Sequence, residues 1–273
     1  INIFKNNKFI EPIAATKPAP GGLLTLQAKK LKCTHAMHFS SFHKYVREDS
    51  IWANRYTTPE TDLKRGWDKK IGYFKQFSSI LITEDGFKKI PSIYPTKNDL
   101  PIHSPEKYGD KWDEELTDFE EKFVIKYLNK IAQVNKNSFS IKVGSMLVSP
   151  DQKFYKAKSP FIFHAPRKSL LRAIKSNIFD DLLIGNFAKV YILENQPVNF
   201  KNTFKVASKY IDNAGVNNLE ELKKFLWVYR NSYDNKLIQI KSEIKVKSRD
   251  LILSKLISNK KTLGLLKNMY QRF

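Results

Sequence analysis

The clearest periodic pattern in the chain lies in residues 237–247, where apolar and polar side chains alternate. Ile238, Ile240, Ile244 and Val246 are separated from one another by glutamine, lysine, serine and glutamate. A period of two sends neighbouring side chains to opposite faces of a strand, so one face is expected to be packed and the other exposed. Shorter apolar or alternating runs predict further strands at residues 79–83, 88–94, 139–148, 153–163 and 187–193.

Apolar residues spaced by three and four predict amphipathic helices. In residues 113–134 the expected buried stripe is Leu116, Phe119, Phe123, Tyr127, Ile131 and Val134. Acidic residues fill the first turns of this segment and lysines its last turns, an order that suits the helix dipole. Asn218, with Glu221 three residues later, predicts a capping box at the start of another helix. The other predicted helices are residues 169–183, 200–211, 218–233 and 249–272.

Residues 1–31 contain three prolines and a Gly-Gly pair without a sustained period, which predicts an extended N-terminal arm. Helices and strands are mixed elsewhere without a regular βαβ repeat. The predicted fold class is therefore α+β, a mixed sheet with several amphipathic helices and an extended N-terminal arm. The expected division is an arm at 1–31, an aromatic and basic subdomain at 32–105, and a basic α+β domain at 106–273.

Charge changes this picture, because the formal net charge is +21. Residues 122–273 hold 29 Lys and Arg against 10 Asp and Glu, whereas residues 106–121 hold eight acids and two bases. Lysine outnumbers arginine 40 to 8, which is also typical of codon drift in an AT-rich gene. Drift does not by itself remove acids from the C-terminal half while leaving them in residues 106–121. Such an excess favours a polyanionic partner, and a phosphate backbone is the usual one.

Two basic clusters are the candidate nucleic-acid contacts. The first lies at the start of the helix expected at residues 169–183, where free backbone N–H groups also favour phosphate. The second lies on the strand at 237–247 and the helix that follows it. Lysine binds a phosphate as a point charge. We therefore expect contacts along the phosphate backbone of the nucleic acid and few sequence-specific contacts to its bases. The predicted binding residues are Arg167, Lys168, Arg172, Lys241, Lys245, Lys247, Arg249, Lys260 and Lys261.

Aromatic and basic residues also interleave in residues 52–77, where Trp52, Tyr56 or Trp67 either stack on unpaired bases or belong to the core. Cys33, His35, His38 and His43 lie within eleven residues and carry metal-capable atoms. Their spacing matches no known zinc module, so polar or core histidines are the favoured interpretation and no metal site is assigned.

An enzyme needs groups that hold a metal or move a proton. Asp234, Glu243 and Lys245 resemble the D…E-x-K arrangement of restriction-endonuclease-like nucleases, in which carboxylates hold Mg²⁺. The resemblance covers three positions, and an alternating charged strand produces E-x-K by chance. The chain has no P-loop, no G-x-G-x-x-G and no G-x-S-x-G, so no cofactor is expected and catalysis is the minority hypothesis.

The chain has a single cysteine and no N-glycosylation sequon, which favours an intracellular location. No apolar run approaches the roughly 20 residues that span a bilayer. The expected function is a structural RNA-binding component of a large ribonucleoprotein, such as a mitochondrial ribosome, with RNA and other protein subunits as partners. The alternatives are an Mg²⁺-dependent nuclease and a non-catalytic scaffold subunit of a protein complex.

Overall fold

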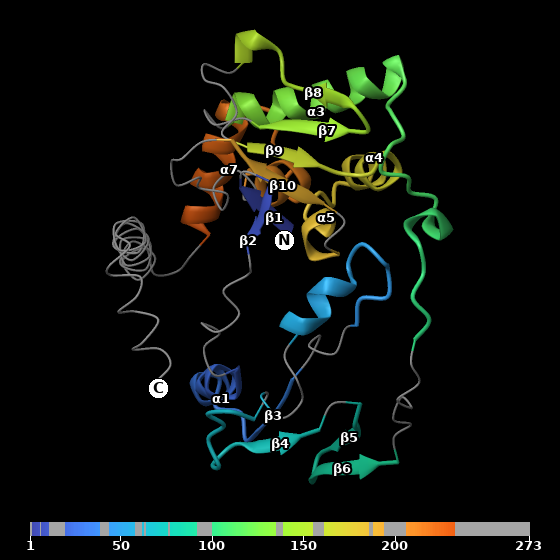
Figure 1. The fold of residues 1–273 in the computed structure, drawn as a ribbon. Helices are drawn as coiled ribbons and strands as arrows, with labels where there is room; N and C mark the ends of the chain where they lie inside the picture. The colour runs from blue at the N-terminus through green and yellow to red at the C-terminus, as the bar shows by residue number, and fades with distance from the viewer. Residues whose placement is uncertain are drawn as a thin grey trace, which may run out of the picture. The chain divides into compact units, whose positions relative to one another are not determined.

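The computed structural model describes residues 2–5, 7–10, 20–38, 44–57, 62, 64–75, 77–91, 100–134, 139–154, 161–185, 188–193 and 206–232. The strand expected at 237–247 and the helix expected at 249–272 lie outside these residues. The chain divides into two compact units, residues 1–12 with 104–273 and residues 13–103. The first contains a six-stranded sheet and the second two small two-stranded sheets (Figure 1).

The six strands of the first unit lie in the order β2-β1-β10-β9-β7-β8. β1 pairs parallel with β10, and β7 parallel with β9, whereas the other neighbours are antiparallel. The strands are β1 (Asn2–Lys5), β2 (Lys8–Ile10), β7 (Ser140–Val143), β8 (Met146–Val148), β9 (Phe161–His164) and β10 (Lys189–Ile192). The sheet is mixed, which confirms the expected α+β class.

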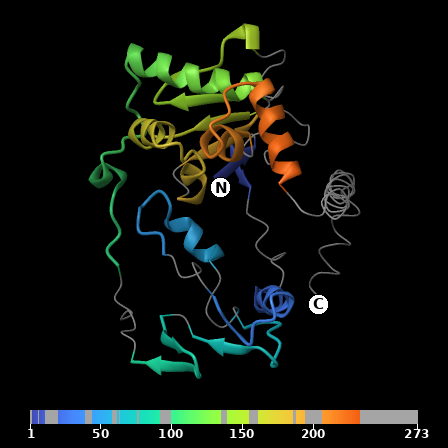
Figure 2. The same cartoon turned by 180° about the vertical axis from the view of Figure 1, so that it is seen from behind.

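One face of this sheet carries the core. In register across the strands lie Ile3, Val190, Phe163, Ile141 and Val148, and the last four are at most 1 % exposed. They form one apolar cluster with side chains of the surrounding helices. α3 (Asp118–Val134), α4 (Arg167–Lys175) and α7 (Leu219–Asn231) lie on the same side of the sheet, as the two opposite views show (Figures 1 and 2). The remaining helical segments are η3 (Pro105–Tyr108), η4 (Gln152–Phe154), α5 (Asp181–Ile184) and η5 (Val206–Asp212).

α3 begins five residues later than the apolar spacing predicts. Its start is fixed by a capping box, in which Thr117 N donates to Glu120 and Glu120 N donates to Thr117 Oγ1. The buried stripe is also rotated relative to the expected one, because Phe119 is 80 % exposed while Val124 and Leu128 are buried. The acidic residues before Thr117 therefore lie in a loop and not in a helix.

Two predicted elements are each divided by a residue in the left-handed region. Gly144 (φ +57°) turns residues 139–148 into the β7–β8 hairpin. Asn177 (φ +54°) ends α4 before α5 begins. There Ile178 N donates to the carbonyl of Ala173 at 2.9 Å, and Asn177 N to that of Ile174 at 3.3 Å, which is a Schellman motif.

The predicted capping of α7 is confirmed, since the side chain of Asn218 accepts a hydrogen bond from Glu221 N at 3.0 Å.

The described part of the segment expected to be an α-helix at 200–211 is instead a π-helix, η5. At its end the buried carboxylate of Asp212 accepts from Tyr127 Oη at 3.0 Å and from Phe179 N at 2.9 Å. Burial raises the pKa of Asp212.

The second unit is built from short elements. Its helices are α1 (Pro20–Lys30) and η2 (Ile51–Tyr56), and its strands are β3 (His35–Met37), β4 (Gly72–Phe74), β5 (Ser79–Thr83) and β6 (Gly86–Ile90). β5 has the predicted bounds of residues 79–83, and β6 overlaps the strand predicted at 88–94 but begins two residues earlier. β1, β2 and α1 all lie in the stretch expected to be an extended arm. Local patterns do not predict β1 because its neighbour is a strand near residue 190.

Candidate nucleic-acid interface

Three of the predicted binding residues, Arg167, Lys168 and Arg172, lie on α4. The structure separates them into two groups. Arg167 faces the loop that precedes α3, whereas Lys168 and Arg172 are exposed. The other predicted residues, Lys241, Lys245, Lys247, Arg249, Lys260 and Lys261, lie outside the described part of the chain and stay predictions.

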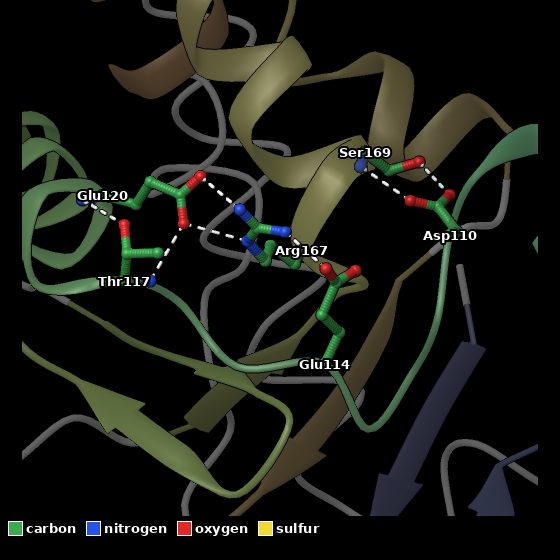
Figure 3. Close-up of polar contacts among 6 residues, drawn as sticks. All are labelled: Asp110, Glu114, Thr117, Glu120, Arg167 and Ser169. Atoms are coloured by element: carbon green, nitrogen blue, oxygen red, sulfur yellow. Dashed lines mark hydrogen bonds and ion pairs between the residues drawn. The ribbon is translucent and has the colours of Figure 1, made fainter.

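An acidic side chain of the protein itself occupies the start of α4 (Figure 3). Asp110, only 2 % exposed, accepts a hydrogen bond from Ser169 N at 2.8 Å and another from Ser169 Oγ. Gly109 (φ +79°) supplies the left-handed turn that brings Asp110 to this position. A carboxylate at the first turn satisfies a free backbone donor and suits the helix dipole. The anion site expected here is thus filled from within the chain.

Arg167 is held by two further acids, Glu114 in the same loop and Glu120 in the first turn of α3 (Figure 3). Its Nε donates to Glu120 Oε2 at 2.9 Å and its Nη2 to Glu120 Oε1 at 2.6 Å, while Nη1 donates to Glu114. This fork lowers the pKa of Glu120 to about 2, the hydrogen bonds from Arg167 being the largest cause. The same pairing raises the pKa of Arg167. A phosphate would have to displace both carboxylates to reach this guanidinium.

The side of α4 that faces away from the core carries cations that have no such partner among the described residues. Lys168, Arg172 and Lys175 are exposed and spaced by four and three residues, so they lie along one face of the helix. Within the described residues, none of the three forms an ion pair with an acid. We call these three side chains the basic ridge. The described part of the chain therefore leaves this charge without a carboxylate partner.

A second candidate surface is the sheet face against which none of the described helices packs, and we call it the open sheet face. Its residues alternate with the core residues along each strand: Phe4 and Tyr191, and next to them Lys189, His164 and Lys142 in register across three strands. All five are half-buried. None belongs to the apolar core cluster. Aromatic rings and lysines on one surface are typical of single-stranded nucleic-acid sites.

His164 lies at the centre of the open sheet face. Its ring is 4.9 Å from that of Trp112 and 6.2 Å from that of Tyr191, measured between centroids. Burial first, and then the charges of Lys189 and Lys142, lower the pKa of His164 to about 4. The imidazole is therefore neutral at pH 7. Its Nε2 is buried and has no hydrogen-bond partner among the described residues.

The sequence interpretation did not single out the open sheet face. Residues 187–193 were expected to form a buried strand, although Lys189 and Tyr191 alternate there with Val190. The same alternation in β9 places Ile162 and His164 opposite Phe161 and Phe163. A period of two in these short runs was the available signal.

The aromatic and histidine residues of the second unit pack mainly on one another. Trp67 stands edge-on to Tyr73 at 4.8 Å between centroids, and its Nε1 donates to the Ile71 carbonyl at 2.7 Å. His35 stacks on Phe74, and His38 is buried near Trp67. Cys33 is exposed, and His43 lies outside the described residues. No group of three or more metal-binding side chains occurs among the residues described.

Comparison with known proteins adds no relative. No protein-family model, curated protein or solved structure matches the chain. Among the helices that the structure describes, none is long and apolar enough to cross a membrane. Asp234, Glu243 and Lys245, the residues of the nuclease alternative, lie beyond the described range.

Proposed function

We propose that the protein is a structural RNA-binding component of a large ribonucleoprotein assembly, of the kind found in a mitochondrial ribosome, and that it contacts the phosphate backbone through lysine-rich surfaces. The basic ridge on α4 carries the proposal. Its three cations are exposed without acidic partners in the described chain, in a protein of net charge +21. Such charge is stabilised when a polyanion replaces its counterions.

The use of the acids in residues 106–121 supports this proposal. They are the densest negative charge in the sequence, and they would weaken the binding of RNA if they lay beside the basic ridge. Asp110, Glu114 and Glu120 instead bind Ser169 and Arg167. Arg167 thus neutralises Glu114 and Glu120, whereas Lys168, Arg172 and Lys175 form no ion pair with these acids.

The test is a titration of duplex RNA binding against salt, comparing the wild type with a variant that carries Lys168→Gln, Arg172→Gln and Lys175→Gln. If each side chain neutralises one phosphate, the steepness of log affinity against log salt falls by about 2–3 units, since each of the three contacts contributes roughly 0.7–0.9. These side chains are exposed, so the thermal midpoint is expected to stay unchanged.

The matched control removes the same charge from α3 through Lys122→Gln, Lys126→Gln and Lys130→Gln. If the two triple variants lose binding equally, net charge alone is responsible and the ridge has no particular role. RNA binding that does not change with salt in the wild type would contradict the proposal and favour a scaffold subunit. RNA cleavage that needs Mg²⁺ and is lost in Glu243→Gln would favour the nuclease.

A further inference from the structure

The two faces of the six-stranded sheet have opposite chemistry. Every strand residue of the sheet that belongs to the apolar core cluster, or packs against it, comes from the helix-covered face. The open sheet face instead presents Phe4, Tyr191, His164 and two lysines. The rings of this surface can stack on a flat group, and its lysines can bind an anion. Its chemistry therefore favours a ligand that is both flat and anionic.

The rings of this face form a continuous series across four strands. Phe4 and Tyr191 are stacked, with 5.2 Å between centroids and 20° between planes. Phe9 follows on one side at 5.8 Å from Phe4, and His164 on the other at 6.2 Å from Tyr191. The series runs from β2 through β1 and β10 to β9. Rings placed in this way offer several adjacent positions at which a base can stack.

The charges lie beside the rings. Lys189 and Lys142 flank His164 in the neighbouring strands, so their Cα atoms are about 10 Å apart at the usual strand spacing of ~4.8 Å. Lys142 has no ion pair with any residue that the structure describes, and Lys189 Nζ lies 4.2 Å from the centroid of the Trp112 ring. Neither cation is neutralised by a carboxylate there, so both remain able to bind phosphate.

We propose that the open sheet face binds unpaired nucleotides of a single-stranded polynucleotide, whose bases stack on Phe4 and Tyr191 and whose phosphates lie beside Lys142 and Lys189. The inference deepens the proposed function by naming the part of the RNA that this face takes. A duplex hides the faces of its bases, whereas an unpaired strand exposes them to aromatic side chains. His164 adds a further flat ring beside that of Tyr191.

The test compares Tyr191→Leu, Tyr191→Phe and the wild type for binding to oligouridine and to an abasic strand of equal length and charge. Stacking contributes ~1–3 kcal/mol per base, so Tyr191→Leu is expected to weaken oligouridine binding by about 5- to 100-fold. Tyr191→Phe keeps the ring and should bind as the wild type does. Phe119→Leu is the matched control, because it removes an exposed ring from α3. It should leave the affinity unchanged.

A second measurement does not depend on how well the variants fold. Wild-type protein is crosslinked by light to oligouridine that carries 4-thiouridine, and the modified peptides are identified by mass spectrometry. Crosslinks are expected in peptides that contain residues 2–5 and 189–193. Oligothymidine carrying 4-thiothymidine, tested in parallel, distinguishes an RNA ligand from a DNA ligand.

The two proposals fail in different ways. Equal affinity of the wild type for oligouridine and for the abasic strand, or crosslinks confined to other peptides, would overturn the assignment of the open sheet face. Duplex RNA binding through the basic ridge would survive that result. If neither duplex nor single strand binds, the proposed function itself is wrong.

Discussion

The two faces of the six-stranded sheet are built from neighbouring residues of the same strands, but one face is buried in the core and the other is only half-buried. Ile141, Phe163 and Val190 are fully buried against the helices. Lys142, His164 and Lys189, each adjacent in sequence to one of these, are half-buried on the other side. The comparison teaches that stability and ligand binding are separated here by a single position along a strand. Substitutions one residue apart should therefore have effects of different kinds.

The largest effect is expected from the core face. Phe163 lies 5.3 Å from Phe179 and 6.2 Å from Phe139 between ring centroids and is fully buried. Phe163→Ala should lower the free energy of unfolding by about 3–5 kcal/mol, because it leaves a cavity among these rings. Urea denaturation measures the loss. Leu147→Ala at the edge of the open sheet face is the control, since Leu147 is 55 % exposed. A loss below about 1 kcal/mol in Phe163→Ala would contradict the contrast between the two faces.

An intermediate effect is expected at the junction between α4 and the loop that carries Trp112. Arg167→Leu removes the partner of Glu114 and Glu120 and should cost about 1–2 kcal/mol, because the two carboxylates are left close together without a cation. Arg172→Leu on the same helix has no ion pair to lose within the described chain and should change stability by less than about 0.5 kcal/mol. Chemical denaturation of both variants tests this difference.

The smallest expected effect is a pH dependence of the difference in unfolding free energy between the wild type and Arg167→Leu. The pKa of Glu120 is about 2 in the folded protein, below its ordinary value of 4.5, because Arg167 stabilises the charged form. The stability from this pair is therefore complete above pH 4.5 and is lost as the pH falls towards 2. The difference in unfolding free energy between the wild type and Arg167→Leu should shrink over that range. Asp212, whose pKa is raised, contributes equally to both proteins and cancels. A difference that stays constant down to pH 2 would be inconsistent with the pairing.

Local signals predicted much of the fold. The capping of α7 by Asn218 and the strands of the β5–β6 hairpin follow from residues a few positions apart. The pairing of Arg167 does not follow from local residues, because its acidic partners Glu114 and Glu120 are 53 and 47 residues away in the sequence. Charge patterns along a chain show where cations are concentrated. They do not show which cations the fold neutralises.

The open sheet face illustrates a second limit. Its rings come from β1, β9 and β10, so no single segment contains them together. Alternation within Lys189–Ile192 indicates that Lys189 and Tyr191 share a face, but only the pairing of β10 with β1 brings Phe4 beside them. Composition and period identify the type of strand. The neighbour of each strand is set by tertiary packing.

The parallel pairing of β1 with β10 has a consequence for how the chain acquires its structure during synthesis. Asn2 finds its partner only when Lys189 has been made. At about 5–20 residues per second, β1 waits roughly ten to forty seconds for its neighbour β10. Throughout that interval Ile3 and Phe4 remain without their final contacts, so the β1 side of the sheet is completed only after residue 189 has been made.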